Sequence, residues 1–146
     1  MNTVIISKEQ LLQYWQGQRN LTRRVIEAFS EDDLFNFTIG GMRPFSMMCA
    51  ELIAIAVPSL KSITSNQITK FDEKPTFTSK AALLKQWDED TVQINALFPL
   101  LTEAQFQNNF VLFGEHDLKI QQHVFYFIDN EIHHRGQAYV YLRALG

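Results

Sequence analysis

Apolar side chains recur at helical spacing along four long segments of this chain of 146 residues. The first segment, residues 7–30, carries them at intervals of three, four and seven residues, which places them on one face of a helix. The members of that face are Leu11, Trp15, Thr22, Val25 and Phe29. Ser7 and Gln10 stand at its start with the spacing of a capping box, which predicts where the helix begins.

The same spacing predicts three further helices, over residues 43–62, 79–98 and 117–144. Pro44 suits the first turn of the second helix, and Pro58 is expected to kink it. Because four amphipathic helices must bury their apolar faces against one another, the fold class expected is an all-α four-helix bundle. A chain of this length has room for one such domain, over residues 1–146.

The connections between these helices differ in character. Residues 64–78 are polar and read as a long loop, of the kind that often serves as a binding or lid segment. Residues 100–114 are ambiguous, and we expect a short helix from Thr102 followed by an irregular connection. No convincing alternation of apolar and polar residues indicates a strand.

Composition limits the partners and the compartment. Acidic and basic side chains are interspersed with a net charge of −3, which argues against a nucleic-acid partner. Cys49 is the only cysteine, so an intrachain disulfide is excluded, and its apolar neighbours predict an inert buried thiol. The longest apolar run, residues 52–58, is far shorter than the roughly 20 residues of a membrane span. We expect a soluble cytoplasmic protein with no membrane partner.

Two adjacent histidines interrupt the apolar stripe of the last helix. His134 lies seven residues after Phe127 and shares its face, and Asn130, one turn before His134, can aim at the same point. An alternative pairing joins Glu131 to His134 with the Glu-x-x-His spacing of carboxylate-bridged metal bundles. His123 is eleven residues from His134, roughly 16 Å along a helix, so one metal ion cannot take both imidazoles.

Glu51 is the second unusual residue, because it is the only charged side chain between Arg43 and Lys61. An ionised carboxylate in an apolar wall should be paired, bound to a metal or protonated. If its helix packs beside the last helix, Glu51 and His134 can face each other. Three alternatives stay open for Glu51: a metal or substrate contact, a buried ion pair with His134 or Arg135, or an exposed position on a helix phased differently.

The remaining conspicuous side chains have structural interpretations. Trp15 and Trp87 are predicted to anchor the core. Arg135 and Gln137 are expected to hold neighbouring helices or an interface. His123 is expected to be a simple surface or helix-face residue.

The string from Asn130 to Gln137, with the Tyr-Val-Tyr-Leu-Arg-Ala-Leu-Gly that ends the chain, closely resembles the C-terminal signature of the DinB/YfiT-like superfamily. The resemblance extends to the helix of Trp15, to the Met-Arg-Pro-Phe that ends at Phe45 and to the helix of Trp87, and so covers nearly the whole chain. It implies a four-helix bundle with a non-sequential helix order that is often a dimer. It also implies a divalent metal, commonly nickel or zinc, on three histidines, one from the second helix and a His-x-x-x-His pair from the last.

Carried onto this sequence, the second histidine of that pair is His134, and the first falls on Asn130. The second helix holds no histidine, and Glu51 is its nearest chemically competent replacement. His133 matches an adjacent family histidine that is not usually a ligand. A divalent metal (nickel, zinc or manganese) on Glu51, Asn130 and His134 is therefore expected to bind more weakly than in three-histidine members, or not at all, because an amide oxygen is a poor zinc ligand.

Since some relatives are thiol-dependent isomerases or transferases, the resemblance implies a metal-dependent transferase or hydrolase that uses a small thiol. In such an enzyme the metal would polarise a substrate or activate a thiol or water, and Glu51 or His133 would move a proton. The alternative hypothesis is a metal-free bundle that binds a small ligand or a protein partner. A homodimer is expected from the exposed aromatic surface of two long helices, and no residue selects a particular substrate.

Overall fold

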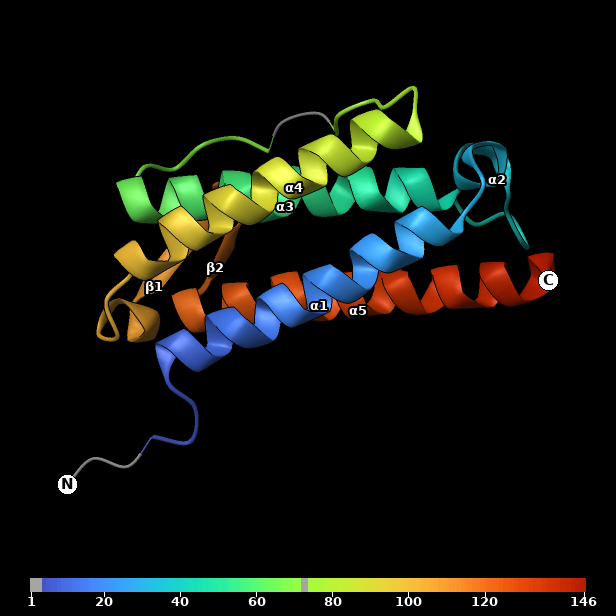
Figure 1. The fold of residues 1–146 in the computed structure, drawn as a ribbon. Coiled ribbons are helices and arrows are strands. Elements are labelled where there is room, and N and C mark those ends of the chain that lie inside the picture. The colour runs from blue at the N-terminus through green and yellow to red at the C-terminus, as the bar shows by residue number, and fades with distance from the viewer. Residues whose placement is uncertain (1–3, 72–73) are drawn as a thin grey trace.

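The computed structural model describes residues 4–71 and 74–146, and the helical fold expected from the sequence is confirmed. Within the described residues, four long helices make up most of the structure (Figure 1). They are α1 (Lys8–Ala28), α3 (Phe45–Ser65), α4 (Lys80–Leu97) and α5 (Ile120–Leu145). The short helix α2 (Glu31–Asn36) links α1 to α3.

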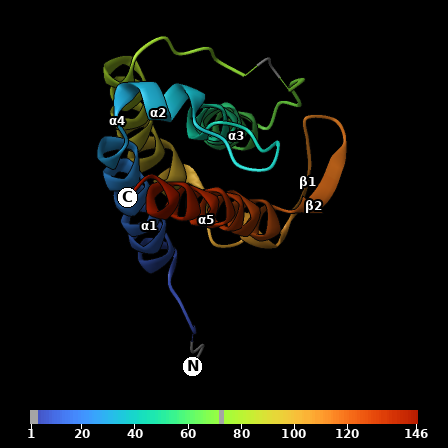
Figure 2. The ribbon, with the colours of Figure 1, turned by 90° about the vertical axis from the view of Figure 1, so that its right-hand side faces the viewer.

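The helices pack around the bundle in the order α1, α4, α3, α5, so neighbours in space are not neighbours in sequence. The view along the helix axes shows α3 beside α5, and α1 beside both α4 and α5 (Figure 2). The order matters for the site because it brings the helix of Glu51 against the helix of His134.

Local signals fix where the helices start and stop. The capping box of α1 is formed: the Ser7 hydroxyl accepts a hydrogen bond from the backbone N–H of Gln10 at 3.1 Å, and the Gln10 side chain accepts one from the backbone N–H of Ser7 at 2.9 Å. Ser79 caps α4 by accepting from the backbone N–H of Ala82 at 3.0 Å. At the C-terminal end of α3, Asn66 takes a left-handed conformation with φ of 54° and ends the helix.

The core consists of two apolar clusters separated along the bundle by a layer of buried polar side chains. In the first cluster Trp15 is fully buried, with its ring 6.2 Å from that of Phe98 and 6.0 Å from that of Phe127. In the second, Trp87 is buried on α4. The sequence prediction that both tryptophans anchor the core is confirmed. In α1 and α5, the side chains of this polar layer lie along the helix between residues of the first cluster and residues of the second.

A β-hairpin stands where an irregular connection was expected. The antiparallel strands β1 (Asn109–Leu112) and β2 (His116–Lys119) precede α5, which therefore begins at Ile120 rather than at residue 117. The prediction was wrong because four-residue strands are too short for a clear pattern, and β2 is exposed along its whole length. The turn depends on Gly114, whose φ of 74° lies in the left-handed region.

Helix α3 is long and apolar enough to cross a membrane by length and composition alone. Inside the bundle, however, 61% of its apolar window is buried against the other helices. The bundle thus supplies the apolar environment that this helix needs, as it does for the core helix of a soluble protein.

The packing around Trp15 yields a first prediction. Replacing Trp15 by Ala should lower the free energy of unfolding by about 3–5 kcal/mol, because it leaves a cavity between two aromatic rings. The neighbouring Tyr14 is half exposed, and Tyr14→Ala should cost less than about 0.5 kcal/mol. Urea unfolding followed by circular dichroism measures both losses; equal losses for the two variants would contradict the packing described.

Candidate functional site

Glu51 and His134 meet between α3 and α5, as the sequence suggested. The two helices run antiparallel side by side, and Glu51 Oε2 lies 2.6 Å from His134 Nε2. The side-chain amide of Asn130, one turn earlier on α5, donates to the same carboxylate oxygen at 3.3 Å. All three residues predicted to hold a metal are thus brought together.

Two basic side chains reach the other oxygen of the same carboxylate. Arg43, in the turn before α3, places Nη1 3.1 Å from Glu51 Oε1, and Lys74, in the loop after α3, places Nζ 3.3 Å from it. Of the three interpretations left open by the sequence, the structure shows an ion pair for Glu51. The cations are Arg43 and Lys74 and not Arg135, while His134, an expected partner, lies within hydrogen-bond distance of the same carboxylate.

Sequence reasoning missed these two basic residues, although weak signals existed. Arg43 lies eight residues before Glu51, about two helical turns, and was considered only as the start of a helix. Lys74 lies in the long polar loop that resembled a binding segment. Nothing in the spacing shows that this loop returns to α3.

These contacts set the ionisation of Glu51, whose side chain is 20% exposed. Burial raises the pKa of Glu51, but the hydrogen bond and charge of His134, the charge of Arg43 and the Asn130 amide together lower it from 4.5 to about 2. Glu51 is consequently an ionised carboxylate at neutral pH. A carboxylate with so low a pKa is a weak proton acceptor, since general bases work best with a pKa near the operating pH.

The second ring nitrogen of His134 also faces an oxygen. Nδ1 lies 3.1 Å from Gln137 Oε1, and the Gln137 amide nitrogen lies 3.8 Å from Met42 Sδ. A neutral imidazole has one N–H, so only the doubly protonated ring donates to both Glu51 and Gln137. Through its contact with Met42, Gln137 ties α5 to the segment before α3, in keeping with the holding role expected for it.

His133, the other proposed proton carrier, points elsewhere. Its side chain is exposed, and its ring packs edge-on against that of His134 with the centroids 5.2 Å apart. The hydrogen bonds to Glu51 within the described residues come from other side chains. A proton-transfer role for His133 stays a prediction.

Glu131 does not pair with His134 but faces α1. It is buried and accepts a hydrogen bond from the Thr22 hydroxyl at 2.7 Å. Arg135 lies 3.9 Å from Glu131 and donates to the backbone carbonyl of Gln18 at 2.8 Å, which confirms its predicted role in holding a neighbouring helix. Burial raises the pKa of Glu131, and the charge of Arg19, the Thr22 hydroxyl and the charge of Arg135 oppose that rise.

Arg19 extends this buried layer toward α4, and sequence reasoning passed over it. Its guanidinium lies 4.1 Å from the centre of the Trp87 ring and donates to the Trp87 carbonyl at 2.9 Å. The available signal was its position: Arg19 follows Trp15 by four residues and precedes Thr22 by three, on the predicted core face of the helix.

His123 and Cys49 are both buried. His123 was expected among simple surface or helix-face residues, but its Nε2 lies 2.8 Å from the Phe110 carbonyl of β1, so the unforeseen hairpin covers it. Cys49 is a free buried thiol, as predicted. Burial, together with the nearby charge of Glu131, raises the pKa of Cys49 well above its usual value, which makes the thiol inert.

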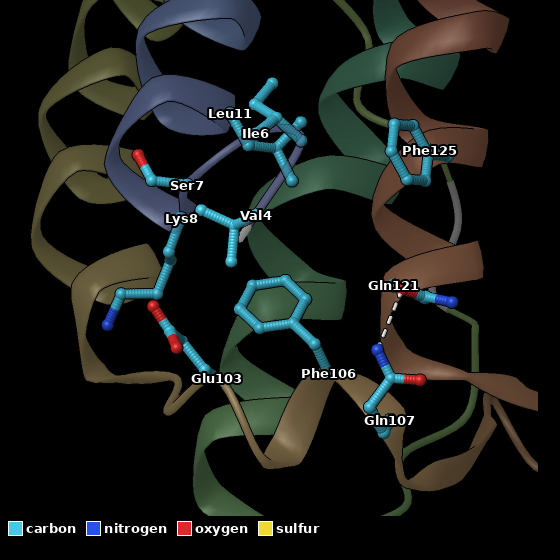
Figure 3. A pocket seen from close by; sticks show the side chains of 10 residues that line it. All are labelled: Val4, Ile6, Ser7, Lys8, Leu11, Glu103, Phe106, Gln107, Gln121 and Phe125. Carbon is cyan, nitrogen blue, oxygen red and sulfur yellow. Dashed lines mark hydrogen bonds between the residues drawn. The ribbon is translucent and has the colours of Figure 1, made fainter. Parts of the chain in front are cut away.

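A separate hollow of about 260 Å³ lies between the segment before α1 and the start of α5 (Figure 3). Apolar side chains such as Val4 and Phe106 line it, and Gln107 donates to Gln121 across one side at 3.2 Å. The Lys8 ammonium at its rim donates a hydrogen bond to the backbone carbonyl of Leu101 at 2.7 Å. Its lining lacks the convergence of charged groups found around Glu51.

The donor set at Glu51 does not fit a divalent metal held by three protein ligands. Across residues 4–71 and 74–146, no group of three or more His, Cys, Asp or Glu side chains gathers at one point. Arg43 and Lys74 bring two positive charges to one carboxylate oxygen, and they would repel a metal cation there. The other oxygen already accepts hydrogen bonds from Asn130 and His134.

The low pKa of Glu51 predicts a pH-dependent contribution to stability. Because the pKa is about 2 in the folded chain and 4.5 ordinarily, this contribution is complete above about pH 4.5 and is lost as pH falls toward 2. The difference in unfolding free energy between wild type and Glu51→Gln should therefore shrink over that range. Urea unfolding at a series of pH values measures it, with exposed Glu103→Gln as control. A difference that stays constant with pH would refute the prediction.

The chain resembles known proteins over its whole length. It matches the DinB family over residues 1–146. Two solved structures share its fold: the DinB-like protein YjoA of Bacillus subtilis, with a TM-score of 0.72, and a DinB-like protein of Bacillus cereus, with a TM-score of 0.75. Each is 20% identical in sequence, and each alignment covers 94% of this chain and 92% of the other.

No curated protein matches the chain. At 20% identity the two solved structures support the fold alone. The match over all 146 residues, on a bundle of the same architecture, shows that the chain belongs to the DinB family.

Proposed function

We propose that this chain is a metal-free DinB bundle that binds a small organic anion at the Glu51 cluster between α3 and α5. The observation that supports the proposal is that Arg43 and Lys74 both approach one carboxylate, Glu51. Two positive charges against one negative charge leave an excess positive charge beside a buried imidazole. Such a site favours an anion over a cation.

The two basic side chains have capacity for a further partner. Arg43 is 34% exposed and Lys74 is 41% exposed, so solvent reaches both. In the described structure each makes a hydrogen bond to Glu51, while a guanidinium carries five N–H donors and an ammonium carries three. The unused donors suit a carboxylate or a phosphate group.

The competing function is the metal-dependent transferase or hydrolase implied by the family resemblance. One observation favours it: Glu51 Oε2 and His134 Nε2 lie 2.6 Å apart, so two atoms able to bind nickel, zinc or manganese converge. Two features argue against a metal site: the two cations beside Glu51, and the replacement of two family histidines. The proposal therefore assigns Glu51 to fixing Arg43 and Lys74 rather than to holding a metal.

Two expectations from the sequence belong to the proposal as well. A cytoplasmic location agrees with a lone buried thiol, Cys49. A homodimer stays a prediction, with the exposed apolar side chains Tyr139 and Val140 of α5 as candidates for its interface.

Metal content and thermal stability distinguish the two functions. Protein purified without a polyhistidine tag should carry no stoichiometric metal, and nickel, zinc or manganese chloride should leave its melting temperature unchanged. A ligand that binds only the folded state must raise that temperature. Stoichiometric metal that is lost in Glu51→Ala would overturn the proposal.

Anion binding is tested with propionate as the probe. Titration at constant ionic strength should shift the NMR signals of the Arg43 side-chain N–H and the Asn130 amide in a saturable way. Arg43→Gln should abolish the Asn130 shift because the guanidinium is its anion contact. Lys85→Gln, at an exposed position on α4, should leave the response intact. Signals that do not move with propionate would contradict the anion site.

A further inference from the structure

A cavity of about 350 Å³ lies between α3, the hairpin and α5. Its walls are predominantly carbon, and its volume falls in the range of small-molecule sites. The lining side chains are Ile55, Phe71, Leu112, Phe113, Leu118 and Tyr126, with His116 and His123 at its edges. Four different parts of the chain therefore build one hollow.

The cavity lies one helical turn from the Glu51 site along α3 and α5. Ile55 lies one turn after Glu51 on α3, and Tyr126 lies one turn before Asn130 on α5. Since these helices run antiparallel, both steps lead in the same direction, by about 6 Å. Side chains four residues apart share a helix face, so the charged cluster and the apolar cavity follow one another along the two helices.

The loop after α3 contributes to both compartments. Phe71 lines the cavity, with its ring 5.1 Å from that of Phe113 in an edge-to-face contact. Lys74, from the same loop, reaches Glu51 Oε1. One segment thus supplies an apolar wall to the cavity and a cation to the neighbouring charged cluster.

Large apolar side chains at the cavity are left accessible to water. Phe71 is 44% exposed and Tyr126 is 52% exposed, and both line the cavity, so a ligand bound there would cover them. Exposed apolar area is unfavourable by about 25 cal/mol per Å². Apolar surface gathered around a hollow, beside polar groups that can fix orientation, is characteristic of a ligand site.

We propose that this cavity is the apolar subsite of the anion site, and that the ligand is a carboxylate with an aromatic or branched apolar tail. The inference rests on the proposed function, because the carboxylate group would bind at Arg43 and Lys74. The tail would lie about one helical turn away, between Ile55 and Tyr126. His123 is held by the Phe110 carbonyl at 2.8 Å, so it helps fix the wall of the cavity.

The probe for this inference is 3-phenylpropionate, compared with propionate for the head group and 3-phenylpropan-1-ol for the tail. In the wild type, 3-phenylpropionate should bind at least about tenfold more tightly than propionate, because burying a phenyl ring contributes roughly 1.5–3 kcal/mol. The alcohol should bind more weakly than 3-phenylpropionate, since it has no charge for Arg43 and Lys74. NMR titration measures all three affinities.

Filling the cavity tests the location of the tail. Ile55→Trp should remove the advantage of 3-phenylpropionate over propionate while propionate binding persists. Val92→Trp, on the exposed face of α4, should keep that advantage. Phe71→Ala changes a part-exposed ring in a loop and should reduce the advantage, which keeps the test decisive if Ile55→Trp fails to fold.

The outcomes separate the two proposals. If propionate and 3-phenylpropionate bind equally well to the wild type, or if Ile55→Trp and Phe71→Ala both keep the advantage, the apolar subsite is refuted while the anion site stands. If neither acid binds, or if the alcohol matches the acid, the anion site fails and the subsite with it.

Discussion

A carboxylate in the middle of an apolar helix must be neutralised, and the arrangement around α3 follows from that requirement. Glu51 draws its partners from the turn before α3, the loop after it and α5. The Glu51 side chain is only 20% exposed, so these contacts offset the cost of removing its charge from water and tie α3 to α5.

A second group of charges lies where α5 faces α1. Glu131, Arg135 and Thr22 form a buried network between α1 and α5, and Arg19 continues it toward Trp87 on α4. This network separates the two apolar clusters of the core. Because polar groups need specific partners where apolar ones do not, such a layer fixes the relative register of the helices.

The two networks give the last helix two chemically different faces. Toward α1, Glu131 is sealed within the bundle and has no ready route to a ligand. Toward α3, Glu51 contacts His134 and pairs with the part-exposed cations Arg43 and Lys74. The family resemblance implies a metal on three histidines, whereas this chain has Asn130 at one of those positions and no histidine on α3. Under the proposed function, Arg43 and Lys74 would therefore make the cluster attract an anion rather than a cation.

The sequence by itself determined the long helices and the core tryptophans, and it singled out Glu51 and His134 as residues that could meet if their helices packed together. Helical periodicity is a local property, and a lone acidic residue in an apolar stripe can be recognised without coordinates. It missed the hairpin, because strands as short as β2 carry no pattern, and it consequently missed the burial of His123.

Only the tertiary structure decided that Lys74 reaches Glu51, that Arg19 stacks on Trp87, and that an apolar cavity adjoins the charged cluster. Each of these joins segments far apart in the chain, and the folding of the loop and the order of the helices, rather than residue spacing, bring them together.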